Sequence, residues 1–183
     1  MDGVFYGELT VVAIWLALLA ASSRGRRDAV GTLLLAVAPV VLAFFEVVNE
    51  TVSHATEYSD QFSRLRLPLF HVPLAILLGG AVYVYGLRAL SRGAVRGTAD
   101  LRAVNWLPSE FRYLAFLAVF STSAWPIEWM GIRLQLWHWV GGQTWNADFL
   151  RGVYQFYVLF VLGSILYAWL LAWLVGAPGG ERR

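Results

Sequence analysis

The sequence predicts an all-α fold: a polytopic membrane helix bundle of about five transmembrane helices, forming one domain over residues 1–183. Hydrophobic residues make up 58% of the chain and the mean hydropathy is +0.59, outside the usual balance of a soluble protein. Apolar runs long enough to cross a hydrocarbon core of about 30 Å recur along the chain. Arginines gather in alternate connections, as expected when every second loop faces the cytoplasm.

Five apolar segments are the predicted helices. They cover residues 4–21, 29–48, 67–90, 111–134 and 150–175. The third is expected to begin near Leu67-Pro68, because proline is tolerated in the first turn of a helix. In the fourth, the hydroxyl side chains and the proline between Ser121 and Pro126 predict a kink or a break. The first follows Asp2 instead of a basic region, so a helix is expected and not a cleaved signal.

The arginines predict the orientation of the bundle. All 14 basic residues are arginine. Those outside the arginine-rich connections and the C-terminal tail are Arg64, Arg66, Arg133 and Arg151. The arginine-rich side is expected to face the cytoplasm, which places the N-terminus outside and the C-terminus in the cytoplasm. We therefore expect a multi-pass protein of the cell membrane.

Absent residue types exclude several functions. Without cysteine the chain has no disulfide, thiolate metal site or cysteine nucleophile. Without lysine it has neither a Schiff-base lysine, as in retinal pigments, nor a P-loop lysine. The net charge of +2 arises mainly from the loops of one side, so it indicates how the chain is oriented in the membrane and predicts no nucleic-acid partner.

A polar stripe marks the end of the second predicted helix. At about 100° per residue, four polar residues fall within an arc of roughly 80°, so a continuing helix would carry them on one face. They are Glu46, Glu50, His54 and Glu57. An ionisable residue beside hydrocarbon usually faces a bundle interior or a cavity, which makes the stripe a candidate site. The alternative is that only the first acid lies within the membrane, because Thr51, Val52 and Thr56 disfavour a helix.

Each predicted helix places a polar residue at a similar height. At about 1.5 Å per residue, Glu46 and Glu128 lie roughly 24–27 Å from the cytoplasmic boundary. Glu8, His71 and Gln155 each lie about one turn from the outer boundary of their helices. Together they predict a polar layer in the outer leaflet that lines a shared cavity. The alternative is that each residue reaches the headgroups on its own.

Paired acids in such a layer predict acid–base chemistry. A carboxylic acid removed from water favours its neutral form, so it can donate a proton near neutral pH. A second carboxylate or a histidine can take the proton back or activate water. We expect Glu46 to act as the general acid and Glu128 as the second acid or the base. The residues expected to tune or orient this pair are His71, Glu50 and His138.

Tryptophans are concentrated around Glu128. Their π faces can stabilise a carbocation. The alternative, an interfacial aromatic belt, is the commoner role for tryptophans at this depth. The residues expected to line a substrate site are Trp125, Trp129, Trp137, Trp139, Gln155 and Glu8, with Trp145 nearby.

A metal centre is a competing use of the same residue types. Glu50 and His54 are spaced i,i+4 and offer an oxygen and a nitrogen ligand. Further ligands would come from Glu46, His71, Glu128 or His138. The three histidines form no HExxH, repeated ExxH or histidine box. We therefore expect no metal and no cofactor.

The segment around Glu128 resembles a known enzyme family. It reads Pro126-Ile127-Glu128, then Gly131, then Trp137-His138-Trp139, with Asn146 further on. This pattern resembles the acid–glycine–W-x-W–asparagine segment of integral-membrane carotenoid hydratases of the bisanhydrobacterioruberin hydratase type. The Glu46 helix, followed by a proline-led helix, is similar to the acid-bearing helix of that family. More loosely, the chain resembles membrane terpene cyclases, which use acids on separate helices to protonate an isoprenoid.

The resemblance implies an apolar isoprenoid or carotenoid lipid that enters from the bilayer. Protonation of a C=C bond or an epoxide would be followed by hydration or cyclisation, without a redox cofactor. The alternative function is non-catalytic: a membrane subunit or a lipid- or pigment-binding protein whose polar layer joins the helices. Interhelical hydrogen bonds contribute only about 1 kcal/mol each, so such a layer would fail gradually on substitution, whereas catalysis would be lost sharply at one or two acids.

Overall fold

Helices make up the fold, together with one short two-stranded ribbon. The computed structural model describes residues 3–24, 28–48, 56–60, 62, 65, 72–99, 101 and 108–139. In chain order its elements are α1 (Gly3–Ser23), α2 (Ala29–Val48), β1 (Thr56–Tyr58), α3 (Leu74–Gly97), α4 (Ser109–Ser121), α5 (Ala124–Arg133) and β2 (Trp137–Trp139). The predicted all-α class is confirmed, while the antiparallel β1–β2 ribbon is an element that the sequence analysis missed.

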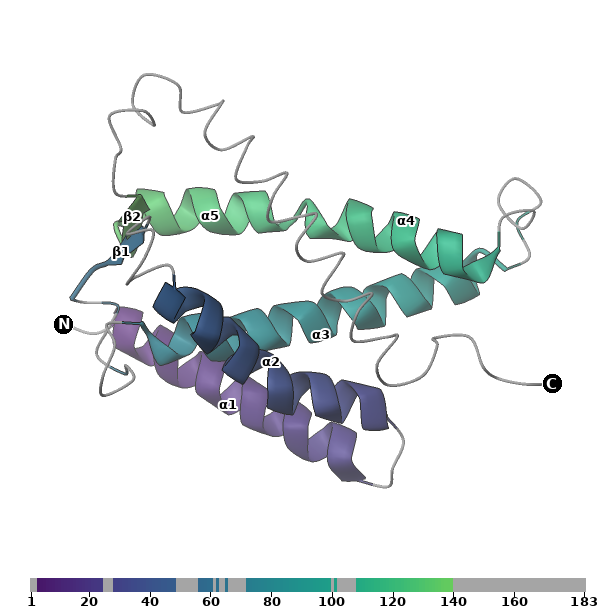
Figure 1. Cartoon of the computed structure of the whole chain (residues 1–183), viewed down its shortest axis with the longest axis horizontal. Coiled ribbons are helices and arrows are strands. Elements are labelled where there is room, and N and C mark those ends of the chain that lie inside the picture. Colours follow the sequence, from purple (N-terminus) through teal and green to yellow (C-terminus); the bar gives the residue numbers. More distant parts are fainter. Residues whose placement is uncertain are drawn as a thin grey trace, which may run out of the picture.

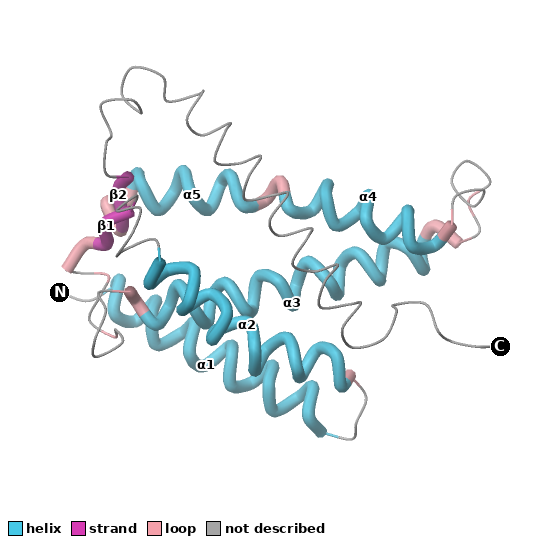
Figure 2. Tube along the Cα trace, in the orientation of Figure 1, coloured by secondary structure: helices cyan, strands magenta, loops and turns pink. Residues whose placement is uncertain are grey.

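α3 is the central helix. It packs against α1, α2 and α4. In Figure 1, α1 and α2 lie on one side of α3, and α4 and α5 follow one another on the other side. The tube in Figure 2 shows that the ribbon lies at the end of the molecule where α1 begins and α5 finishes. The buried stripe of α3 includes Leu77, Ala81 and Val84, at the spacing of one helix face.

Two of the described helices are long and apolar enough to cross a membrane. They are α1 and α3, and the apolar part of α2, Ala29–Phe44, is shorter. Large apolar side chains on α1 are exposed, including Tyr6 at 65% and Leu16 at 52%. The fifth predicted helix, residues 150–175, lies outside the described residues.

The bounds of α2 match the prediction, but those of α3 do not. The sequence analysis begins this helix near residue 67, whereas the structure begins it at Leu74, after an extended Pro73 with ψ of 133°. A proline disfavours the helical conformation of the residue before it, so Val72 stays outside the helix. At its other end α3 continues past the predicted Leu90 to Gly97, where Val95 still packs against the α3–α4 core.

The predicted break in the fourth apolar segment is confirmed: α4 ends at Ser121 and α5 begins at Ala124. The three hydroxyl side chains at residues 121–123 bond back to carbonyl oxygens of the preceding turn, each at 2.6 Å. Tyr83 of α3 donates its hydroxyl to the Ser121 carbonyl oxygen at 3.1 Å. Pro126 falls in the first turn of α5, where its missing N–H leaves no bond unmade. The break is therefore stabilised by hydrogen bonds from its own hydroxyl side chains and from Tyr83 of α3.

The missing N–H of a second proline is compensated by a donor side chain from a neighbouring helix. Pro39 lies inside α2 and has no N–H to donate to the carbonyl of Leu35, four residues earlier. The indole N–H of Trp15 in α1 donates to that carbonyl oxygen at 2.9 Å. Leu35 is fully buried, so its carbonyl oxygen would otherwise lack a donor in an apolar environment. This bond ties α1 to α2.

Asp28 fixes the other end of α2. Its Oδ1 accepts a hydrogen bond from the Gly31 backbone N–H at 3.0 Å, the geometry of a helix N-cap. The same carboxylate makes two hydrogen bonds with Arg88 of α3, at 2.7 and 2.8 Å. Burial alone raises the pKa of Asp28, but the bonds from Arg88 and Gly31 outweigh it and hold the pKa below its ordinary value of 3.8.

Candidate active site

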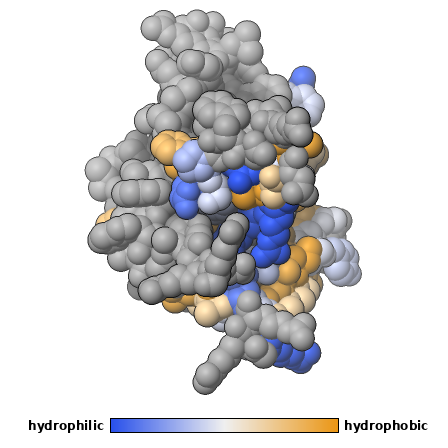
Figure 3. Space-filling model, turned by 90° about the vertical axis from the view of Figure 1, so that its right-hand side faces the viewer, coloured by the Kyte–Doolittle hydropathy of each residue, from blue (hydrophilic) through white to orange (hydrophobic). Residues whose placement is uncertain are grey.

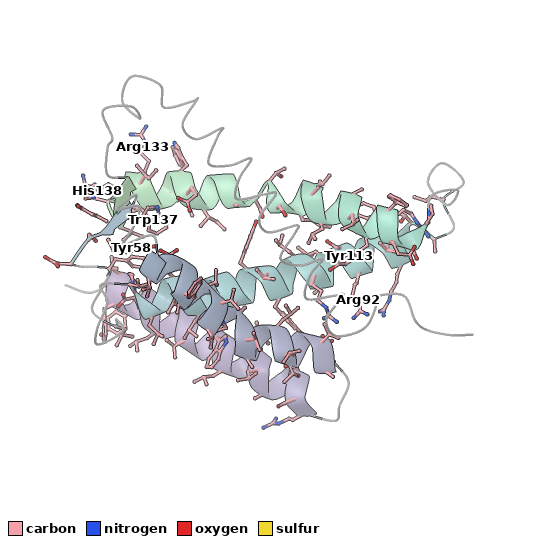
Figure 4. All side chains as sticks on the ribbon, viewed as in Figure 1. Tyr58, Arg92, Tyr113, Arg133, Trp137 and His138 are labelled. Atoms are coloured by element: carbon pink, nitrogen blue, oxygen red, sulfur yellow. The ribbon has the colours of Figure 1, made fainter. Side chains whose placement is uncertain are left out.

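The β1–β2 ribbon joins two distant parts of the chain. Thr56, Glu57 and Tyr58 pair with Trp139, His138 and Trp137, in that order. Successive side chains on a strand point to opposite faces, so Tyr58 and Trp137 share one face and Glu57 and His138 the other. Figure 4 shows Tyr58 and Trp137 at the ribbon end of the bundle, with His138 at the periphery.

Tyr58 and Trp137 each donate a hydrogen bond to one glutamate. The Tyr58 hydroxyl donates to Glu46 Oε2 at 2.8 Å. The Trp137 indole Nε1–H donates to Glu128 Oε2 at 3.1 Å. The ribbon therefore holds the carboxyl groups of α2 and α5 through two donors that are direct cross-strand partners.

The two acids that the sequence analysis pairs lie near one another. Their donors, Tyr58 and Trp137, are cross-strand partners, so the two carboxyl groups lie close enough to interact electrostatically. Both side chains are half-buried. Two half-buried carboxyl groups that interact with each other, each with a hydrogen-bond donor, can pass a proton to a bound molecule and take one back.

An aromatic cluster forms one wall of the site. Phe62 lies between the other two rings, with centroid distances of 6.4 Å to Tyr58 and 5.6 Å to Trp137. Phe62 and Trp137 are buried together with Ala75 of α3. The sequence analysis missed Tyr58 and Phe62. The alternation of apolar and polar residues in T-E-Y and W-H-W is a weak strand signal that could have identified the ribbon.

The turn after α5 sets the position of Trp137. Gln135 has a φ of 56°, and the backbone N–H groups of Gln135 and Leu136 bond to the Ile132 and Gly131 carbonyl oxygens at 3.1 and 2.9 Å. This is the Schellman arrangement, in which a left-handed residue reverses the chain after a helix. The reversal lays the Trp137 ring directly over Gly131, where a Cβ would overlap the indole. Gly131 therefore makes room for the ring that donates to Glu128.

A third acid lies at the same end of the molecule. Glu8 of α1 is 1% exposed. Val4 and Val11, which share its helix face, pack against the cluster of Phe62, Ala75 and Trp137. The structure thus brings Glu8, Glu46 and Glu128, from three helices, to the ribbon end.

The predicted helical stripe is wrong at Glu57. This residue belongs to β1, and its exposed carboxylate pairs with the exposed His138 imidazole at 2.9 Å. The β-branched residues before it favour a strand over a helix. This agrees with the alternative in which only Glu46 lies within the membrane. Glu50 and His54 lie outside the described residues.

The remaining predicted site residues divide into three groups. Trp129 lies on the outside of α5, 42% exposed, with the Arg133 guanidinium 5.5 Å from its ring centroid, a position that fits the interfacial alternative. Trp125 and Trp139 belong to α5 and β2, but their side chains are not among those described. His71, Trp145 and Gln155 lie outside the described residues.

No group of three or more His, Asp or Glu side chains is placed to bind a metal within the described part of the chain. Glu46 and Glu128 are only two side chains, and the His138 imidazole pairs with Glu57. Comparisons with protein-family models, curated proteins and solved structures give no match for this chain. Its function is therefore argued from the geometry of the site.

Proposed function

We propose that this protein is a multi-pass membrane enzyme that carries out acid–base chemistry on an isoprenoid or carotenoid lipid. The observation that carries the proposal is the pair of glutamates from α2 and α5, each oriented by a donor from the same ribbon. Such an arrangement needs no redox cofactor. Its natural reaction is proton transfer to and from an apolar molecule that has been taken out of water.

Membrane placement is supported by the distribution of apolar surface. α1 and α3 have the length and composition of membrane spans. On α5, Ile127 and Met130 flank Glu128 in the sequence and are 44% and 50% exposed. Exposed apolar side chains beside a half-buried acid suit a substrate that arrives from the hydrocarbon phase, where no water competes for the acid.

The reaction balances with the two acids alone. Glu46 in its neutral form donates a proton to one carbon of a C=C bond, which leaves a carbocation on the other carbon and a carboxylate on Glu46. Water then adds to the carbocation, and Glu128 takes the proton that the adding water releases. For cyclisation, a second C=C bond attacks the carbocation, and Glu128 takes the proton that the resulting ring cation loses. In both reactions the proton then passes from Glu128 back to Glu46, which restores the starting state. Hydration adds one water to the substrate, whereas cyclisation leaves its mass unchanged.

The aromatic cluster supports this chemistry in two ways. The faces of the Phe62 and Trp137 rings can stabilise a nearby cation. Hydrogen bonds from Tyr58 and Trp137 hold the two carboxyl groups in fixed orientations, so little reorganisation is needed during proton transfer. Tyr58 and Trp137 are therefore positioning residues, and Glu46 and Glu128 are the catalytic pair.

Mass spectrometry of lipid extracts tests the proposal. A carotenoid-producing host that expresses the protein is compared with the same host carrying an empty vector. We expect a new species one water heavier than its precursor, or an isomer of unchanged mass with a new retention time. Identical extracts across hosts that supply acyclic, cyclic and epoxidised isoprenoids would contradict the proposal and favour a structural or lipid-binding role for the polar layer.

A further inference from the structure

A second set of polar groups lies at the end of the molecule opposite the ribbon. Four arginines from α3 and α4 belong to it: Arg88, Arg92, Arg96 and Arg112. Figure 3 views this end of the molecule, and hydrophilic residues are gathered near its centre with apolar residues beside them. None of these groups takes part in the chemistry assigned to Glu46 and Glu128.

Among the described residues, Arg88 is the one of these arginines that forms an ion pair. It is 7% exposed and makes a bidentate ion pair with Asp28, with a shortest N–O distance of 2.7 Å. Arg92 follows one helical turn later on the same side of α3. Among the described residues Arg92 has no ion pair and no hydrogen bond, so its positive charge remains available at the junction of α2, α3 and α4.

Two hydroxyl groups at this junction have no acceptor. Ser91 is fully buried, and its Oγ has no hydrogen-bond partner among the described residues. It shares a face of α3 with Leu87 and Val95, which pack against Tyr113 of α4. Tyr113 is 8% exposed, and its hydroxyl makes no hydrogen bond with any described residue.

Positive charge lies close to the Tyr113 hydroxyl. The charges of Arg88 and Arg92 both act on the Tyr113 hydroxyl. Figure 4 shows Arg92 and Tyr113 on the neighbouring helices α3 and α4. On α4, Arg112 uses one terminal nitrogen to bond the Thr98 carbonyl at 3.2 Å, while its buried Nε has no partner among the described residues. Ser91 Oγ and Arg112 Nε are therefore two buried donors without an acceptor among the described residues. Buried donors normally have acceptors, and with the positive charge beside them the acceptor that fits this end is an anion.

We propose that this junction binds a phosphate group, with Arg92 and Tyr113 as its donors. A phosphate offers several strong acceptor oxygens and a negative charge, which matches one guanidinium that is unpaired among the described residues beside a tyrosine hydroxyl. An anionic phospholipid and free phosphate share this chemistry. The site is independent of the proposed enzymatic function.

The position of Arg92 along α3 favours a lipid as the source. At about 1.5 Å per residue, Arg92 lies roughly 27 Å from the start of α3 at Leu74. A hydrocarbon core is about 30 Å thick, so an α3 that spans the bilayer from Leu74 brings Arg92 to the level of the headgroup phosphates. The same end is arginine-rich, as expected for the leaflet that carries anionic lipids.

Native mass spectrometry of the full chain in detergent micelles tests the site. Phosphatidylglycerol is titrated against phosphatidylcholine, whose choline cation cancels the phosphate charge. We expect phosphatidylglycerol to bind at least about tenfold more tightly, and Arg92→Gln to weaken its binding about tenfold, because charge-assisted hydrogen bonds are lost. Arg133→Gln, the same change of charge at the ribbon end, is the matched control and should bind like the wild type.

Three further results decide whether the bound phosphate group belongs to a lipid or is free, and whether Tyr113 takes part in binding. If inorganic phosphate raises the thermal midpoint of the wild type at constant ionic strength, but not that of Arg92→Gln, the site accepts free phosphate too. If it has no effect, the ligand is the lipid. Tyr113→Phe keeps every charge and should still weaken binding, which provides a test if Arg92→Gln does not fold. Equal binding of both lipids, or equal phosphatidylglycerol binding by all variants, overturns the proposal.

Discussion

Tyr58 and Trp137 face each other across the β1–β2 ribbon, and each donates a hydrogen bond to a different glutamate. The strand pairing therefore couples the orientation of Glu46 on α2 to that of Glu128 on α5. If the two acids act as a pair, weakening either donor should affect turnover more than stability.

Removal of one donor provides the first prediction. Tyr58→Phe keeps the ring that packs on Phe62 but removes the hydroxyl that donates to Glu46. A hydrogen bond to a carboxylate contributes about 1.5–3 kcal/mol, so turnover should fall at least about tenfold. Tyr6→Phe, at a tyrosine that is 65% exposed on α1, is the matched control and should leave turnover unchanged. Equal turnover in both variants would remove Tyr58 from the site.

Gly131 tests the placement of Trp137. A methyl group in Gly131→Ala would overlap the indole and displace it from Glu128. We expect a loss of turnover together with a destabilisation of about 1–3 kcal/mol from overpacking. Gly93→Ala is the control, because a Cβ there meets nothing within 4 Å. That control should stabilise the helix by up to about 1 kcal/mol, as measured by unfolding in detergent.

The bond from Trp15 to Leu35 can be tested by a double-mutant cycle. Trp15→Phe removes the donor and should lower the free energy of unfolding by about 1–3 kcal/mol, since a buried carbonyl loses its partner. Pro39→Ala restores an N–H that can donate to the same carbonyl. In that background Trp15→Phe should therefore cost less. The same cost in both backgrounds would show that the Leu35 carbonyl does not depend on Trp15.

The lowered pKa of Asp28 predicts how the free energy of unfolding depends on pH. Its pKa in the folded protein lies below the ordinary value of 3.8, so the unfolded chain takes up this proton first as the pH falls. The stabilisation is therefore fully present above the ordinary pKa and is lost as the pH falls through the lower, folded value. The difference in unfolding free energy between the wild type and Asp28→Asn should shrink over that interval. Asp60→Asn, at an exposed site, should follow the wild type; a constant difference for Asp28→Asn would contradict the assignment.

Sequence reasoning located the features that depend on local chemistry. The bounds of α2 follow from a run of apolar residues after a capping aspartate, and the break between α4 and α5 follows from hydroxyl residues before Pro126. The donor to the carbonyl that Pro39 leaves free could not be predicted in this way, because the donor to Leu35 comes from another helix. Packing, not the local sequence, decides such contacts.

The candidate site was predictable only in part. Glu46 and Glu128 stand out because acids are rare in membrane-length apolar segments. Their hydrogen-bond donors come from a ribbon whose strands are far apart in the sequence, and three-residue strands carry too little periodicity to be recognised. The prediction that the α2 helix extends to Glu57 was wrong because β-branched residues precede this acid and because Glu57 pairs with His138 of β2.

The measurement that tests the central claim most directly compares lipid extracts from hosts expressing the wild type, Glu46→Gln, Glu128→Gln and Glu57→Gln. Glutamine keeps the size of each side chain and removes only its acid–base function. Glu57, which is exposed on the outer face of the ribbon, provides the matched control. We predict that the product, one water heavier or an isomer of its precursor, is absent with Glu46→Gln and Glu128→Gln and present with Glu57→Gln, at equal protein levels. Full product formation by Glu46→Gln and Glu128→Gln would contradict the account.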